Sequence, residues 1–197
     1  MILLTDSFGQ SAHIKIPRNI KKLGISMSGG ADSAAVASIV KVMCNLVATE
    51  IKTGIEADSV KVKDDLLRIA PHLLDDTKFR ILNEPNGEWM FSSIVCEHIL
   101  HTLYMGTENS SDVTTRRASD LARGIGSFHN TILIDSIVKA ILGVFSLAQK
   151  SIKAIDGTQN LESPRYHVQG GTWQEDIALQ NIQARLRMVT AYLFAQL

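Results

Sequence analysis

A turn of six residues, Ser28-Gly29-Gly30-Ala31-Asp32-Ser33, constrains this chain more than any other feature. It lies between an apolar run at 23–27 and a stretch from 31 to about 47 whose apolar residues recur at helical spacing. The two glycines permit a tight turn, and the helix that follows directs free N–H groups and its positive dipole end at an anion. Two serine hydroxyls add donors, and Asp32 can hold a metal ion. The turn predicts a phosphate-binding loop; the alternative is an ordinary glycine-rich turn between a strand and a helix.

Strand-like and helix-like segments alternate along the chain, which predicts an α/β fold with a parallel sheet. The expected strands are 23–27, 102–105 and 131–134. The expected helices are 31–47, 112–123 with Ser111 as its cap and Gly124 as its stop, and one that begins at Asp135 or Ser136. A helical insert at about 49–101 contains helices near 60–74 and 89–99. The polar stretch 151–171 shows no period and predicts a mobile loop, either a lid or plain surface.

Composition narrows the class of protein. The length of 197 residues predicts a single domain, 1–197, and a net charge of zero disfavours nucleic acid or a membrane surface as partner. Cys44 and Cys96 lie in apolar helix-like stretches and predict core thiols in a reducing compartment. No apolar run of about 18 residues and no signal peptide is evident. We therefore expect a cytoplasmic protein with no membrane-spanning segment.

The last segment predicts a long amphipathic helix, 174–197. Thr172 and Glu175 have the spacing of a capping box at its start. Asn181 and Arg185 share one face, and Gln183 and Arg187 share another, so the two arginines point in nearly opposite directions. Spacing alone is also compatible with two solvated arginines that bind nothing.

Several motifs resemble known families. The turn at 28–33 is similar to the SGGxDS loop of the ATP pyrophosphatases. The segments 104–111 (YMGTENSS), 125–129 (IGSFH), 145–147 (FSL) and 177–188 (IALQNIQARLRM) follow in the order seen in NAD synthetases, most closely the glutamine-dependent type. The resemblance covers residues 23–197. It implies a Rossmann-like, three-layer fold of the adenine-nucleotide hydrolase type.

The resemblance also implies an activity. NAD synthetases are ligases of NAD biosynthesis that use ATP to adenylylate deamido-NAD; ammonia then displaces AMP, and pyrophosphate is released. By similarity, Arg187 and Arg185 would bind deamido-NAD, Asp32 would bind Mg²⁺, and Ser28 would be a positioned donor to the transferring phosphate. The helix 174–197 would lie at a homodimer interface. The implied ATP-binding residues are Ser26, Met27, Ser28, Gly29, Gly30, Ala31, Asp32, Ser33 and Met105.

Departures from the family pattern generate a second hypothesis. Residues ahead of the first strand are too few for an amidase domain, so we expect ammonia, or a companion subunit, as the source of nitrogen. The family's next strand, with its Mg²⁺-binding glutamate, lies beyond residue 197, which predicts a truncated domain. Strand 23–27 would then be an edge covered by oligomerisation, by a companion chain or by residues 1–20. The alternative function is a catalytically incomplete nucleotide-binding or assembly fragment; neutral charge disfavours a tRNA-modifying enzyme.

Overall fold

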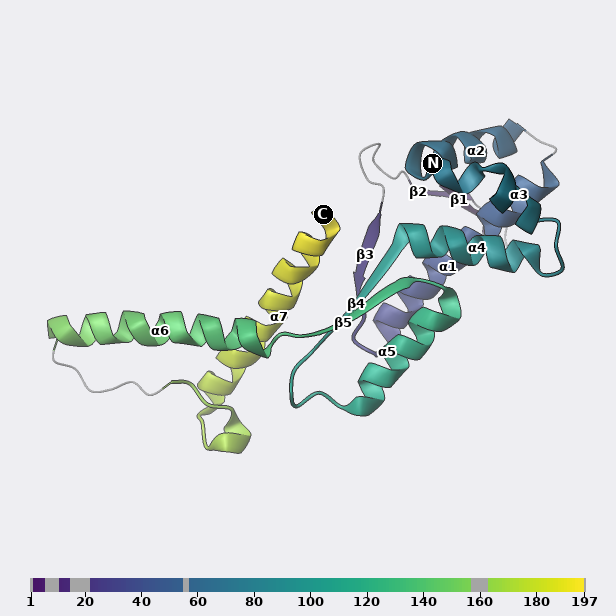
Figure 1. Ribbon diagram of the computed structural model, residues 1–197. Helices are drawn as coiled ribbons and strands as arrows, with labels where there is room; N and C mark the ends of the chain where they lie inside the picture. Colours follow the sequence, from purple (N-terminus) through teal and green to yellow (C-terminus); the bar gives the residue numbers. More distant parts are fainter. Residues whose placement is uncertain (1, 6–10, 15–21, 55–56, 157–162, 197) are drawn as a thin grey trace. The chain divides into compact units, whose positions relative to one another are not determined.

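The computed structural model describes residues 2–5, 11–14, 22–54, 57–156 and 163–196 (Figure 1). The chain divides into two units, each described here by itself. Unit 1 comprises Met1–Tyr104 and Ser111–Asn130, and unit 2 comprises Met105–Ser110 and Thr131–Leu197. The prediction of a single domain stays a prediction.

From residue 23 onward, the described strands alternate with helical segments as the sequence predicts, whereas the two strands before it were not predicted. The strands are β1 (Ile2–Thr5), β2 (Ser11–Ile14), β3 (Leu23–Ser26), β4 (Leu100–Gly106) and β5 (Phe128–Leu133). The helices are α1 (Ala31–Thr53), α2 (Ala57–Ile69), α3 (Asp76–Ile81), α4 (Gly87–Ile99), α5 (Asp112–Ile125), α6 (Asp135–Asp156) and α7 (Trp173–Gln196). Two 3₁₀ helices, η1 (Pro71–Leu74) and η2 (His167–Gln169), complete the set.

A three-stranded sheet in the order β3-β4-β5 carries the fold. Strand β3 runs parallel to β4 with Leu23 opposite Leu100 and Ser26 opposite Leu103, and the Met27 N–H donates to Leu103 O at 2.9 Å. Strand β4 is almost entirely buried, as its central place in the sheet requires. The predicted α/β class with parallel pairing is confirmed.

Strand β3 has one neighbour, β4, among the described strands. Strands β1 and β2 pair with each other in antiparallel register, Ile2 opposite Ile14, and form a separate sheet. The described part of residues 1–20 therefore does not cover the outer edge of β3. The expectation that β3 is an edge strand agrees with this arrangement.

Helix α1 packs on α4 and forms the centre of the core of unit 1. Ala37, Cys44, Phe91, Val95 and Cys96 are fully buried between the two helices and their neighbours. By length and composition alone, helix α1 is long and apolar enough to cross a membrane. This corrects the expectation that no segment of the chain would meet those two criteria. Its apolar residues on one face are buried in the core of unit 1, and this burial explains part of its high hydropathy.

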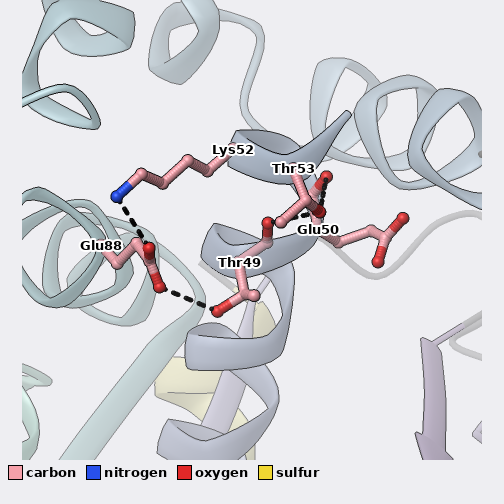
Figure 2. Close-up of polar contacts among 5 residues, drawn as sticks. All are labelled: Thr49, Glu50, Lys52, Thr53 and Glu88. Atoms are coloured by element: carbon pink, nitrogen blue, oxygen red, sulfur yellow. Dashed lines mark hydrogen bonds and ion pairs between the residues drawn. The ribbon is translucent and has the colours of Figure 1, made fainter. Parts of the chain in front are cut away.

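A polar contact joins the ends of these helices (Figure 2). Lys52 Nζ lies 2.8 Å from the carboxylate of Glu88, and Thr49 Oγ1 donates to the same carboxylate at 3.1 Å. These hydrogen bonds, with the charge of Lys52, hold the pKa of Glu88 below its ordinary value. Lys52 is in the last turn of α1 and Glu88 is in the first turn of α4. Each charge therefore also interacts favourably with the dipole of its own helix.

Element ends show where the sequence predictions were inaccurate. Helix α5 has Ser111 as its predicted cap, which accepts from Val113 N–H, but it ends at Gly126 rather than at Gly124. Gly126 has the left-handed backbone (φ 73°) that ends helices, and Gly124 lies inside the helix. Helix α1 continues to Thr53. Strand β5 begins earlier than predicted, at Phe128.

The polar stretch 151–171 is not one loop. Helix α6 continues through Asp156, so the predicted loop is wrong for its first six residues. Residues 157–162 lie outside the described residues. After them, η2 precedes α7, whose capping box is confirmed: Thr172 N–H donates to the Glu175 carboxylate at 2.6 Å, and Glu175 N–H donates to Thr172 Oγ1 at 3.3 Å.

The edge position of β3 predicts an alternating pattern of hydrogen exchange. Because Met27 N–H points to β4, Ile25 N–H points the same way, whereas the N–H groups of Gly24 and Ser26 point outward. We expect Gly24 and Ser26 to exchange at least about tenfold faster than Ile25 and Met27. Exchange measured by NMR checks this, and equal protection of all four amides would mean that another segment or chain pairs with the edge.

Two histidines predict acid sensitivity of the fold. Burial lowers the pKa of His129, whose Nδ1 lies 2.8 Å from the buried Thr102 Oγ1. Burial and then the charges of Lys22 and His98 lower the pKa of His101. The unfolded chain, with histidine pKa values near 6.5, therefore binds more protons as the pH falls, and we expect thermal stability to drop below about pH 6.5.

Thermal unfolding between about pH 7.5 and 5.5 measures this dependence. The matched variant His129→Asn keeps a polar atom near the Nδ1 position and cannot take up a proton. We expect it to show a shallower pH dependence than the wild type. If the thermal stability of His129→Asn depended on pH as steeply as that of the wild type, the acid sensitivity would not come from His129.

Candidate functional site

The turn between β3 and α1 has the backbone of a loop that comes close to its neighbours. Gly29 has a positive φ of 77°, which side chains other than glycine rarely adopt. A Cβ atom at Gly29 would lie 2.5 Å from the carbonyl oxygen of Thr114, in the first turn of α5. The first glycine of the motif is thus required both by its dihedral angle and by its contact with α5.

The two serines of the motif bind each other and the loop. Ser33 Oγ accepts from Ser28 N–H at 3.2 Å and donates to Gly30 O at 3.2 Å. Ser28 Oγ accepts from Gly30 N–H at 3.2 Å and lies 3.1 Å from Ser33 Oγ. Because the single proton of Ser33 goes to Gly30, Ser28 is the donor between the hydroxyls. A ligand oxygen can replace Ser33 Oγ as the acceptor of the hydrogen bond from the Ser28 hydroxyl. Ser28 is therefore suited to donate a hydrogen bond to a ligand.

The N-terminus of α1 supplies further donors. Its N-cap is Gly30, with extended backbone (φ −94°, ψ 172°) and no side-chain cap. Ala34 N–H is the first to donate within the helix, to Gly30 O at 3.2 Å. The N–H groups of Ala31, Asp32 and Ser33 come before it, and no described residue accepts from them. Ala31 and Asp32 are exposed. This is the arrangement that binds an anion at a helix N-terminus.

Asp32 is the acidic residue in the first turn of α1, and it is exposed. Within the described ranges no group of three or more histidine, cysteine or acidic side chains could hold a metal ion. A single carboxylate fits Mg²⁺, which keeps several waters and takes its other ligands from substrate phosphates. Asp32 is therefore suited to Mg²⁺ that arrives with a nucleotide.

The predicted substrate residues Arg187 and Arg185 lie in unit 2, and Arg187 contacts the end of β4. Arg187 Nε donates to the backbone oxygen of Met105 at 2.9 Å, and Arg187 is half-buried. Ile134 N–H donates to Gly106 O at 2.9 Å, and the Asp135 carboxylate accepts from Glu108 N–H at 3.0 Å. The turn that follows β4 is therefore fixed by contacts from α6 and α7. Met105 itself is buried, and its carbonyl meets α7.

The other arginine has a local role. Arg185 Nη1 donates to the Asn181 side chain at 3.2 Å, which confirms the predicted pair, and both residues are exposed. Gln183 and Arg187 lie four residues apart on α7, as the sequence indicates, and Gln183 donates to the hydroxyl of Tyr166. Burial raises the pKa of Tyr166, and the bond from Gln183 opposes that rise.

The structure brings the predicted residues together in two groups. Residues 26–33, in unit 1, run from the end of β3 through the turn into the first turn of α1, and Met105 and Arg187 are in contact in unit 2. Sequence reasoning missed Thr114 and Tyr166. Thr114 comes shortly after the YMGTENSS motif, in the first turn of the predicted helix 112–123. That position could have indicated that Thr114 lies near the glycine turn. No sequence pattern pointed to Tyr166.

The chain is similar to glutamine-dependent NAD(+) synthetases. It is 40% identical to the enzyme of Rattus norvegicus over 173 residues, 42% to that of Oryza sativa over 174, and 38% to that of Saccharomyces cerevisiae over 175. Each match covers 88% of this chain. The chain spans about one fifth of the length of these curated relatives. No family model matches it.

A solved structure supports the fold. A glutamine-dependent NAD(+) synthetase from Cytophaga hutchinsonii superimposes with a TM-score of 0.58 at 24% identity, covering 90% of this chain and 26% of that one. This likeness confirms the predicted Rossmann-like α/β fold. Together with the sequence identities, it confirms the resemblance to a segment of the NAD synthetases.

The different backbone angles and contacts of Gly29 and Gly30 predict that substitution by alanine is tolerated at Gly30 but not at Gly29. We expect Gly29→Ala to lower the free energy of unfolding by at least about 1–2 kcal/mol, because of its left-handed backbone and the Thr114 carbonyl. Gly30→Ala is the matched control, since Gly30 has a negative φ and its nearest atom would be Ser28 Oγ at 3.2 Å. We expect it to cost less than about 0.5 kcal/mol. Urea unfolding measures both, and equal losses would show that the contact with α5 does not fix the loop.

Proposed function

We propose that this chain, which corresponds to a segment of the NAD(+) synthetases, takes part in the ATP-dependent amidation of deamido-NAD to NAD. The observation that carries the proposal is the Ser28–Ser33 turn, in which the Ser28 hydroxyl precedes a helix N-terminus whose first N–H groups have no acceptor among the described residues. The identity of about 40% to enzymes with that printed name supports it. The carboxylate of deamido-NAD would be adenylylated by ATP and then take up ammonia, with release of pyrophosphate and AMP.

The loop would bind the phosphates of ATP. The N–H groups of Ala31, Asp32 and Ser33 donate to phosphate oxygens, and Ser28 turns its hydroxyl proton from Ser33 to the nucleotide. Donors fixed before binding stabilise charge that develops as pyrophosphate leaves, without reorganising. Mg²⁺, when bound, would neutralise phosphate charge, and the Asp32 carboxylate is the group that would hold it.

Arg187 and Arg185 would bind the second substrate. The Arg187 guanidinium is planar and held by the Met105 carbonyl, so its remaining donors have a fixed direction suited to a carboxylate or phosphate. Helix α7 exposes Met188, Val189 and Tyr192, an apolar surface that supports a homodimer formed through this helix. We further propose a cytoplasmic location, because both cysteines are free thiols.

A second function is nucleotide binding without turnover. Asp32 is the one acidic side chain of the turn at 28–33, and within the described residues it belongs to no group of three or more histidine, cysteine or acidic side chains that could hold a metal ion. A chain with these features could bind ATP and serve as an assembly module. Binding and turnover therefore have to be measured separately.

Turnover separates the two functions, and Asp32 tests the nucleotide binding that both of them require. With ATP, Mg²⁺, deamido-NAD and ammonium, we expect the chain to form AMP and NAD, and Asp32→Asn to lower the affinity for magnesium–ATP at least about tenfold, the equivalent of about 1.4 kcal/mol. Asp120→Asn is the matched control, because Asp120 is an exposed acid whose contact is with Arg123 at 3.0 Å. Calorimetry measures binding, and chromatography of the nucleotides measures turnover.

Each outcome has a distinct meaning. ATP binding that depends on Asp32, without AMP or NAD, would favour the binding module over the enzyme. A folded chain with no affinity for magnesium–ATP would contradict both functions.

A further inference from the structure

A buried tyrosine near the end of β4 binds the helix that follows it. Tyr104 is 5% exposed, and its ring belongs to the core of unit 1. Its hydroxyl lies 3.0 Å from Thr114 Oγ1, in the first turn of α5. A buried tyrosine hydroxyl needs such a partner, because an unpaired one would be costly. The proposed nucleotide binding assigns no role to either side chain.

The proton positions give this hydrogen bond a direction. Thr114 Oγ1 donates its single proton to Ser111 O at 2.7 Å. Tyr104 is therefore the donor to Thr114, whose hydroxyl both donates and accepts. Ser111 is the residue that caps α5. The bond from Tyr104 thus ties β4 to the capped first turn of α5.

The backbone of Thr114 packs directly against the turn at 28–33. A Cβ atom at Gly29 would lie 2.5 Å from Thr114 O and 3.1 Å from both the carbonyl carbon and the Cα of Thr114. We call this stretch of backbone the wall of the turn. Gly29 has the left-handed backbone of the turn, with a φ of 77°. The position of the wall therefore limits how far Gly29 can move.

The end of β4 holds the turn at two points. Leu103 O accepts from Met27 N–H at 2.9 Å, immediately before the turn. Tyr104, the next residue of β4, holds the wall against Gly29. Ser28 lies between these two points, and its hydroxyl is the proposed donor to phosphate. The direction of that hydroxyl thus depends on both contacts.

We propose that Tyr104 is a positioning residue for nucleotide binding: through Thr114 it fixes Gly29, and so it fixes the directions of the donors that the turn offers to phosphate. Donors held in place before a ligand arrives bind it more tightly, because less freedom is lost on binding. Tyr104 itself touches no phosphate. The choice of phosphate as the ligand rests on the proposed function, whereas the effect of Tyr104 on the turn does not.

Phenylalanine at position 104 separates the hydroxyl from the ring. Tyr104→Phe keeps the aromatic packing in the core and removes the donor to Thr114. A tyrosine that served the core alone would leave the affinity for magnesium–ATP unchanged in this variant. Because a typical hydrogen bond changes an equilibrium roughly fivefold, we expect the dissociation constant for magnesium–ATP to rise roughly fivefold. Calorimetry on the full chain measures this constant, and circular dichroism establishes that the variant is folded.

Two neighbouring threonines supply a matched pair of variants. Thr114→Val keeps the shape of the side chain and removes the acceptor for Tyr104, so we expect a similar rise of roughly fivefold. Thr115→Val is the control, because Thr115 Oγ1 also donates to Ser111 O, at 3.2 Å, whereas the Tyr104 hydroxyl lies against Thr114. We expect Thr115→Val to bind magnesium–ATP as the wild type does.

The double variant tests whether the effect passes through Thr114. Tyr104→Phe and Thr114→Val remove the same hydrogen bond, so together they should weaken binding no more than either does alone. Losses that multiply, to roughly 25-fold in total, would show that the two side chains act separately and would overturn the proposal.

Solvent exchange of the Gly30 N–H tests the turn without a nucleotide. This N–H donates to Ser28 Oγ at 3.2 Å, inside the turn. We expect Tyr104→Phe to speed its exchange, measured by NMR, at least about threefold, while exchange of Ile25 N–H in β3 stays unchanged.

The two measurements separate this proposal from the proposed function. If the folded wild type has no affinity for magnesium–ATP, the proposed function fails, and the exchange of Gly30 alone decides whether Tyr104 fixes the turn. Exchange of Gly30 at the wild-type rate in Tyr104→Phe would overturn the proposal. So would an unchanged affinity of Tyr104→Phe for magnesium–ATP when the wild type binds it.

Discussion

The packing of α1 against α4 is the interaction on which the rest of unit 1 depends. Helix α1 follows β3 through the glycine turn, so its position determines where its first-turn N–H groups point. Three kinds of contact fix it along its length: the Gly29 approach to Thr114 at its start, the buried side chains in its middle, and Lys52 with Glu88 at its end (Figure 2). The apolar contacts supply most of the stability, because an ion pair whose side chains are 42% exposed contributes little. The polar contact sets the register of the two helices.

The sequence was sufficient for the features that depend on local chemistry. The glycine turn at 28–33, the Ser111 cap and the Thr172–Glu175 box each have side chains that satisfy nearby backbone groups, and all three local structures are present as predicted. Phosphate binding by the turn stays a prediction. Element ends were less predictable, since tertiary contacts decide them. Two glycines two residues apart could each end α5. Gly126 does so, with its Cα facing Ser93 of α4 and with Ser127 N–H bonded to Ala122 O.

Contacts between distant segments could not be predicted from spacing. Helical geometry correctly paired Asn181 with Arg185, four residues apart. Gln183 and Arg187 are likewise four residues apart on one face, but spacing does not identify their hydrogen-bond partners: Gln183 binds the Tyr166 hydroxyl, and Arg187 binds the Met105 carbonyl. Each partner comes from outside the helix, 17 and 82 residues away in sequence. Lys41 shows the same limit: it was one charge in an apolar helix until the fold placed Ser92 and Ser93 against it.

For the proposed function, the turn at 28–33 and Arg187 would each offer hydrogen-bond donors that are held in place before a ligand arrives. In the loop, the Ser28 proton goes to Ser33, so the hydroxyl is satisfied and needs only to rotate to serve a phosphate. The Arg187 guanidinium has five N–H donors, and the one at Nε donates to the Met105 carbonyl oxygen. That bond fixes the plane of the guanidinium and so the direction of the donors at its other end. In both places an internal hydrogen bond lowers the entropy that binding would otherwise cost, which is the physical basis of preorganisation.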